Sequence, residues 1–115
     1  MTFNVTGNKL NAILNQRSQD MLAANNWNVL QYASLVYMFA MVSDLEVGEF
    51  VHVIADAHIY DRHVPLIEEI IAQKSYDAPK LTIDPVEDFY QFTPEHFHLE
   101  NYQYNPGSVR FPVAI

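Results

Sequence analysis

Alternating apolar and polar positions in the first part of the chain predict a β-hairpin. Residues Thr2–Val5 and Lys9–Arg17 have the two-residue period of strands, and Gly7 and Asn8 between them tolerate the positive φ angles of a tight turn. One face of the second strand is apolar and consists of Leu10, Ala12 and Leu14. We expect this face to pack against the core of the protein.

The segment from Met21 to Ser43 contains no charged residue and predicts the longest helix of the chain. Asn25 or Asn26 is suited to the N-cap position of this helix, which we expect to end near Ser43 or Asp44. Its apolar residues occupy all sides, so we expect burial on nearly all sides. A small chain has trouble surrounding such a helix, which indicates a missing part or an oligomer. The apolar centre is shorter than the roughly 20 residues that span a bilayer, so a membrane protein is not expected.

Residues Phe50–Tyr60, which follow a break at Gly48, alternate again and predict a third long strand. One face of this strand is apolar and consists of Val51, Val53, Ala55, Ala57 and Ile59. The other face carries Asp56, His58 and Tyr60 in a row, each about 7 Å from the next. Polar groups on an inward face need partners, so this row is either a satisfied polar network or part of a binding site.

The remainder of the chain predicts an amphipathic helix and two short strands. The helix covers Pro65–Gln73, and its apolar positions are expected to pack on the sheet. The strands are Lys80–Ile83 and Phe97–Tyr102, and Thr93-Pro94-Glu95 between them is typical of a helix start. The tail Val109–Ile115 is apolar, which is unusual for a terminus. This indicates that the tail docks on another surface, which could be that of a bound ligand.

Length and composition fit one globular domain that covers residues 1–115, half of which are hydrophobic. We expect an α/β (α+β) fold whose mixed, mainly antiparallel sheet carries the helices Trp27–Ser43 and Pro65–Gln73 on one face. The net charge of −8 argues against a nucleic acid polymer as partner, although a few groups can hold one nucleotide phosphate. There is no cysteine and no signal-peptide pattern at Met1, so a cytoplasmic protein is expected.

Polar residues concentrate where the second strand ends and the long helix begins. Arg17, Ser18 and Asp20 lie at the strand end, and Asn28 follows at the helix start. Such a corner favours phosphate, because the free N–H groups and the dipole of a helix start attract anions. The simpler interpretation is ordinary turn polarity with Arg17 ion-paired to Asp20. A metal site is a weaker alternative, because Asp-x-His spacing without a further ligand is a weak metal signature. No metal is predicted. That site would use His52, Asp56, His58 and His63.

Four motifs occur in a fixed order along the chain. They are Gln16-Arg17-Ser18-x-Asp20, Asn28, Asp56-x-His58-x-Tyr60 and the final Pro112-Val113-Ala114-Ile115. Together they resemble the C-terminal part of the thymidylate synthase family, which methylates dUMP to dTMP with 5,10-methylenetetrahydrofolate as carbon donor and reductant. The resemblance covers the whole chain and a little under half of the family's length.

The resemblance implies a role for each matching residue. Arg17 and Ser18 match positions that bind the dUMP phosphate, and Asn28 matches the amide that accepts from uracil N3–H and donates to O4. His58 and Tyr60 match the groups that hold the deoxyribose 3′-hydroxyl. The implied dUMP set is Arg17, Ser18, Asp20, Asn28, His58 and Tyr60, and the implied folate set is Asp20, Ala24, Trp27 and Ala114. Within the folate set Asp20 orients the pterin ring, and the tail with Ala114 closes over the folate.

Three departures from the family pattern bear on activity. Ala24 stands where the family has a flexible glycine, and Trp27 stands where phenylalanine is common. The nucleophilic cysteine, which attacks C6 of uracil, belongs just upstream of the first strand, before Met1, together with further arginines and the catalytic glutamate. The resemblance therefore implies no catalytic residue in this chain and no dTMP formation by the chain alone.

The leading hypothesis is a C-terminal portion of thymidylate synthase that binds dUMP and reduced folate and forms a homodimer or higher oligomer through its sheet. One alternative is half of a split enzyme that needs an N-terminal partner polypeptide. Another is a non-enzymatic dimerisation module that uses the apolar face of the third strand. The related family that hydroxymethylates dCMP needs an acid in place of Asn28, so Asn28 favours uracil.

Overall fold

A computed structural model of the chain describes residues 1–106. The hairpin expected at the start is confirmed: β1 (Thr2–Thr6) pairs antiparallel with β2 (Lys9–Asp20), and Gly7 in the turn has a φ of +63°. Strand β3 (Glu46–His58) pairs with β2 in parallel. The order β1-β2-β3 gives the expected mixed sheet, and its long β2–β3 pairing is the parallel one.

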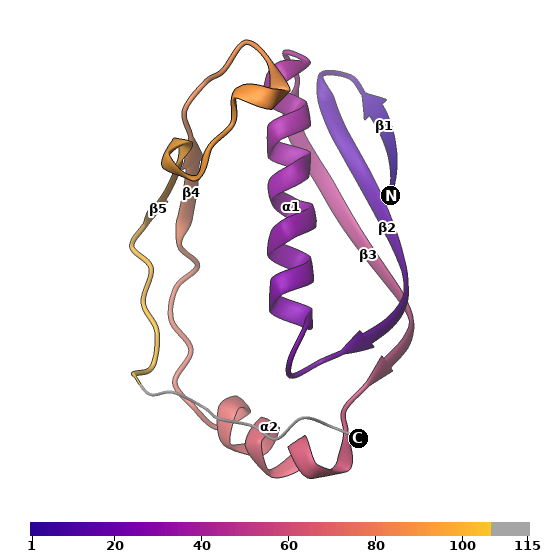
Figure 1. Cartoon of the computed structure of the whole chain (residues 1–115), viewed down its shortest axis with the longest axis vertical. Helices are drawn as coiled ribbons and strands as arrows, with labels where there is room; N and C mark the ends of the chain where they lie inside the picture. Colours follow the sequence, from indigo (N-terminus) through magenta and orange to yellow (C-terminus); the bar gives the residue numbers. More distant parts are fainter. Residues whose placement is uncertain (107–115) are drawn as a thin grey trace.

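Helix α1 (Asn25–Val42) connects the parallel strands β2 and β3 and covers one face of their sheet (Figure 1). The predicted apolar face of β2 is the sheet's contribution to the core. Leu10, Ala12 and Leu14 are at most 7% exposed, and Val36 and Ala40 of α1 are 1% exposed. Phe39, Leu45 and Phe50 pack around this cluster.

The expectation that α1 is buried on nearly all sides is wrong for its first turns. Trp27 is 77% exposed and Leu30 is 62% exposed, whereas only Val36 and Ala40 of the helix are buried. The reason is geometric, because the sheet covers a single face of the helix along its length. The uncovered apolar side chains leave α1 with a surface suited to further protein contacts.

Gly48 was expected to mark a break before the third strand, but β3 begins at Glu46 and Gly48 lies inside it. A β-bulge accompanies this position, since the β2–β3 register shifts between Leu10 and Ala12. A Cβ atom at Gly48 would collide with Asn11 Oδ1 and would lie 2.8 Å from the Leu10 carbonyl oxygen. Glycine is therefore required here by the close approach of β2 rather than by a turn.

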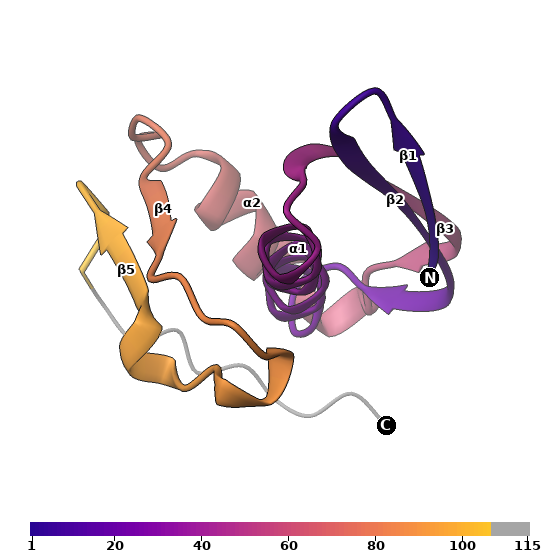
Figure 2. The ribbon, with the colours of Figure 1, turned by 90° about the horizontal axis from the view of Figure 1, so that it is seen from above.

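The second half of the chain forms a smaller layer across α1 from the main sheet. Its elements are η1 (Asp61–His63), α2 (Val64–Ile71), β4 (Lys80–Ile83), η2 (Phe89–Gln91), η3 (Pro94–His96) and β5 (Phe97–Glu100). Strands β4 and β5 pair antiparallel, and α1 lies between them and the β1–β3 sheet in both views (Figures 1 and 2). Helix α2 lies on the same side of the main sheet as α1, beyond the lower end of α1 in Figure 1. The expectation that its apolar positions pack on the sheet is wrong, because no residue of α2 is buried and Ile71 is 76% exposed.

The helix start predicted at Thr93-Pro94-Glu95 produces only a 3₁₀ turn before β5. No helix in residues 1–106 combines the length and the hydropathy that crossing a membrane requires. The apolar tail, with Ala114, lies outside the described residues.

Candidate functional site

Parallel pairing of β2 with β3 brings two distant segments of the sequence to one edge of the sheet. The register sets Ser18 beside Asp56 and Asp20 beside His58. The backbone N–H of Met21 donates to the carbonyl oxygen of His58 at 3.0 Å, which extends the pairing past the strand end. We call Ser18, Asp20, Asp56 and His58 the strand-end cluster, and it combines the polar residues that the sequence placed at two separate strand ends.

Asp20 builds the turn that leads from β2 into α1. Its Oδ1 accepts the backbone N–H groups of Leu22 and Ala23, both at 3.0 Å, and its carbonyl oxygen accepts the N–H of Ala24 at 3.1 Å. The N-cap of α1 is Ala24, without a side-chain hydrogen bond, so the prediction of Asn25 or Asn26 at that position is wrong. Asp20 therefore organises the backbone that leads into the helix.

Asn28 is held against the sheet by a buried glutamine. Its Nδ2 donates to Gln19 Oε1 at 3.1 Å, and Gln19 is only 1% exposed. Gln16 Nε2 also donates to Gln19 Oε1 and to the Ser18 carbonyl oxygen at 2.9 Å, while Gln16 Oε1 lies 2.8 Å from His52 Nε2. These bonds join α1, β2 and β3 at the point where the candidate uracil-reading amide lies.

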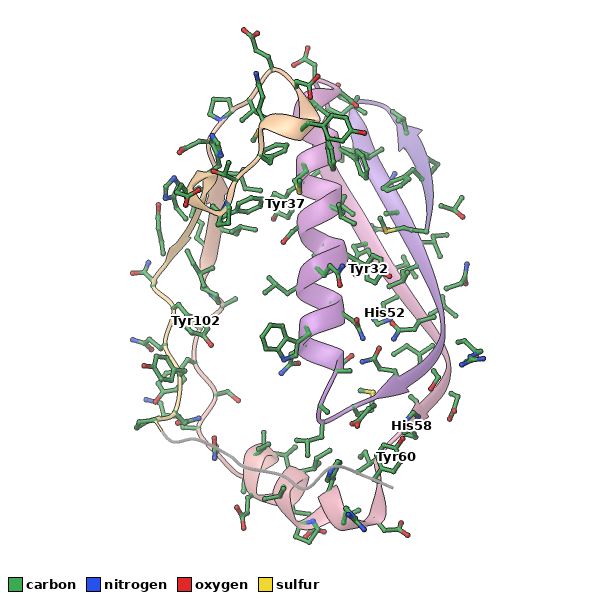
Figure 3. The ribbon with its side chains drawn as sticks, viewed as in Figure 1. Tyr32, Tyr37, His52, His58, Tyr60 and Tyr102 are labelled. Carbon is green, nitrogen blue, oxygen red and sulfur yellow. The ribbon has the colours of Figure 1, made fainter. Side chains whose placement is uncertain are left out.

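His58 and Tyr60 lie side by side at the end of β3 (Figure 3). Their rings meet edge to face, with centroids 5.2 Å apart, and Tyr60 contacts His63 in the same way at 5.7 Å. His58 Nδ1 lies 3.3 Å from the Asp56 carbonyl oxygen and 3.7 Å from Asp56 Oδ2. Because β3 ends at His58, the expectation that Tyr60 belongs to the strand face is wrong, although its ring remains next to that of His58.

The remaining candidates differ in their surroundings. Arg17 and Ser18 are exposed, and the part of the chain that the structure describes offers no hydrogen bond or ion pair to the Arg17 guanidinium, including the pair with Asp20 considered above. Ala24 is half-buried and Trp27 is largely exposed at the start of α1. The alternative metal site finds no support, since no group of His, Asp and Glu side chains suited to a metal ion occurs in residues 1–106.

Sequence reasoning missed the roles of Gln19 and His52. The motif names Gln16 and leaves position 19 open, and His52 enters the sequence analysis only as a possible metal ligand. No sequence signal marks Gln19, because two-residue alternation puts it on the face of the exposed Arg17 and opposite Leu14, whereas the structure buries it.

Comparison with known proteins gives a consistent result. The thymidylate synthase family model matches residues 1–115. The chain is 40% identical over 116 residues to a thymidylate synthase of Clostridium beijerinckii, covering 98% of this chain and 44% of the relative. It is 39% identical over 108 residues to a thymidylate synthase of Bacillus phage phi3T, covering 93% of this chain and 38% of the relative.

The structure is similar to the thermostable thymidylate synthase A from Bacillus subtilis, with a TM-score of 0.91 and 36% sequence identity. The match covers 96% of this chain and 40% of that one. The chain therefore spans less than half the length of the relatives it matches.

Proposed function

The chain belongs to the thymidylate synthase family, and from this premise we propose that its residues form the C-terminal portion of the enzyme and carry part of the dUMP and folate site. The observation that supports this most is the β2–β3 register, which sets the residues of the strand-end cluster next to one another, while Gln19, between Ser18 and Asp20, bonds Asn28 at the start of α1. Convergence of residues from β2, α1 and β3 is what recognition of one small molecule requires.

In the proposed site dUMP is recognised at three points. The exposed Arg17 guanidinium and the Ser18 hydroxyl bind the phosphate, the Asn28 amide reads the uracil edge, and the His58–Tyr60 pair holds the 3′-hydroxyl. Planar guanidinium groups suit phosphate because they donate two parallel hydrogen bonds. The contact between the rings of His58 and Tyr60 supports their joint role at one sugar hydroxyl.

The proposed folate contacts adjoin this site. Oδ1 of Asp20 is engaged by the turn, so Oδ2 is the oxygen we assign to the pterin of 5,10-methylenetetrahydrofolate. Trp27 offers an exposed aromatic ring next to Asn28. Ala24, at the N-cap of α1, stands where the family has a glycine. Ala114 completes the proposed folate set. We propose no metal, and the cytoplasmic location stays a prediction.

The covalent step is assigned outside these residues. Methyl transfer to dUMP in this family begins with attack of a cysteine sulfur on C6 of the uracil ring, and the 115 residues contain no cysteine. The proposed role of the chain is therefore to bind and orient the nucleotide and the folate. A second polypeptide that supplies the cysteine would make it one half of a split enzyme.

Substitution of Arg17 tests the phosphate contact. In Arg17→Ala we expect the Kd for dUMP to rise about tenfold to a hundredfold, because a charge-assisted hydrogen bond contributes roughly 1.5–3 kcal/mol. Deoxyuridine, which lacks the phosphate, should bind the variant as it binds the parent chain. Both affinities are measured by NMR titration, which tolerates weak binding.

The matched control for this experiment is Lys80→Ala, which removes an exposed cation from β4. It should leave both affinities unchanged. Equal losses for dUMP and deoxyuridine in Arg17→Ala, or no loss for either, would contradict the proposed phosphate contact.

The exposed apolar face of the main sheet supports self-association, in which the sheets of two copies pack together. Val51, Val53 and Ile13 are 44%, 48% and 43% exposed on neighbouring strands. We expect the chain to sediment as a dimer or larger species, and Val51→Lys with Val53→Lys to yield the monomer. Ile71→Lys, at a 76% exposed position of α2, is the control that should not dissociate it. A parent chain that sediments as a monomer at high concentration would refute this proposal.

A further inference from the structure

Gln19 is a buried side-chain amide whose two ends both have partners. Its Oε1 accepts from Asn28 Nδ2 at 3.1 Å and from Gln16 Nε2, and its Nε2 donates to the Asp20 carbonyl oxygen at 3.3 Å. With an exposure of 1%, this amide would be unfavourable without such bonds. Burial and hydrogen bonding together therefore hold the Gln19 amide in one position at the end of β2.

Backbone carbonyl groups fix which end of each amide is which. The oxygen and nitrogen of an amide side chain have nearly the same shape, but a carbonyl oxygen only accepts hydrogen bonds. Gln16 must direct its NH₂ group at the Ser18 carbonyl, and Gln19 must direct its own at the Asp20 carbonyl. Gln19 consequently presents Oε1 to Asn28, so Asn28 must donate from Nδ2.

The orientation of Asn28 determines what it can recognise. One N–H of Nδ2 is committed to Gln19, and within residues 1–106 this leaves the second N–H and Oδ1 for a ligand. A donor beside an acceptor complements uracil, which offers O4 as acceptor and N3–H as donor. Cytosine offers the opposite pair and would require a flipped amide, and the flip would place Asn28 Oδ1 against Gln19 Oε1, two acceptors with no hydrogen between them.

We propose that Gln19 is a positioning residue that locks the Asn28 amide and thereby sets a preference for uracil over cytosine nucleotides. The proposal rests on the dUMP site proposed above and names a determinant of its specificity. His52 supports this arrangement from β3, because its Nε2 lies 2.8 Å from Gln16 Oε1 and holds that glutamine in place.

The test substitutes Gln19→Met in the 115-residue chain, which keeps the volume close but removes both ends of the amide. NMR titrations with dUMP and with dCMP give the ratio of the two Kd values. We expect the preference of the parent chain for dUMP to fall about tenfold or more in the variant, because Asn28 becomes free to flip. Gln73→Met, at an exposed position after α2, should retain the parental ratio.

An unchanged ratio in Gln19→Met, with dUMP still bound, would overturn the role of Gln19 alone. Failure of the parent chain to bind either nucleotide would instead overturn the proposed function and the specificity drawn from it. A third measurement needs no variant: in the parent chain, a scalar coupling should connect the Asn28 side-chain nitrogen to the Gln19 side-chain carbonyl carbon across their hydrogen bond. Its absence from a folded sample would overturn the proposed lock whatever the variant does.

Discussion

The purified chain is expected to form no dTMP from dUMP and 5,10-methylenetetrahydrofolate. The reaction of this family depends on a covalent bond between a cysteine sulfur and C6 of uracil, and the 115 residues hold no cysteine. The proposed binding groups Arg17 and Asn28 would orient the substrate, but they cannot replace a nucleophile that forms an intermediate. Turnover should therefore equal that of a blank without protein, as measured by folate oxidation and by chromatography of the nucleotide product.

The control for this experiment is the same assay with a cysteine-bearing N-terminal polypeptide of the family added. Appearance of dTMP in the mixture would identify the chain as one half of a split enzyme and would show that its sites are competent. Formation of dTMP above the blank by the chain alone would contradict the assignment of the covalent step to another segment.

The second large effect concerns the packing that holds the site in place. Leu10→Ala should lower the free energy of unfolding by about 2–5 kcal/mol, because Leu10 is 7% exposed in the core between β2 and α1. Ordinary domains have only about 5–15 kcal/mol of stability, so part of the population is expected to unfold. Urea denaturation followed by circular dichroism measures the loss.

Leu30→Ala is the matched control, since it makes the same substitution at a 62% exposed position of α1. It should change the free energy of unfolding by about 0.5 kcal/mol or less. If the two variants lose the same stability, the core does not lie between α1 and the main sheet, and the positions of Asp20 and Asn28 would need another explanation.

The fold could be predicted from local pattern wherever one face of an element meets the core. The apolar side of β2, the hairpin at Gly7 and the strand at Lys80–Ile83 all follow from two-residue alternation and turn chemistry. The burial of α1 could not be predicted in this way. An apolar side chain such as Trp27 favours burial, but the sequence does not say whether another element covers it.

The candidate site shows the same division. The chemistry of Arg17, His58 and Tyr60 is visible in the sequence, but their spatial relations depend on strand register. Parallel pairing of β2 with β3 places Asp20 beside His58, and no local pattern indicates that register. The hydrogen bond between Gln16 and His52, which are 36 residues apart, was hidden for the same reason.

The central claim is that the ends of β2 and β3 and the start of α1 form one wall of a pyrimidine deoxynucleotide site. A dUMP titration followed by assigned NMR signals of the chain tests this claim most directly. We predict that the signals of Arg17, Asn28 and His58 move together and fit a single Kd. Signals of these residues that stay fixed at millimolar dUMP, or that fit unrelated affinities, would contradict it.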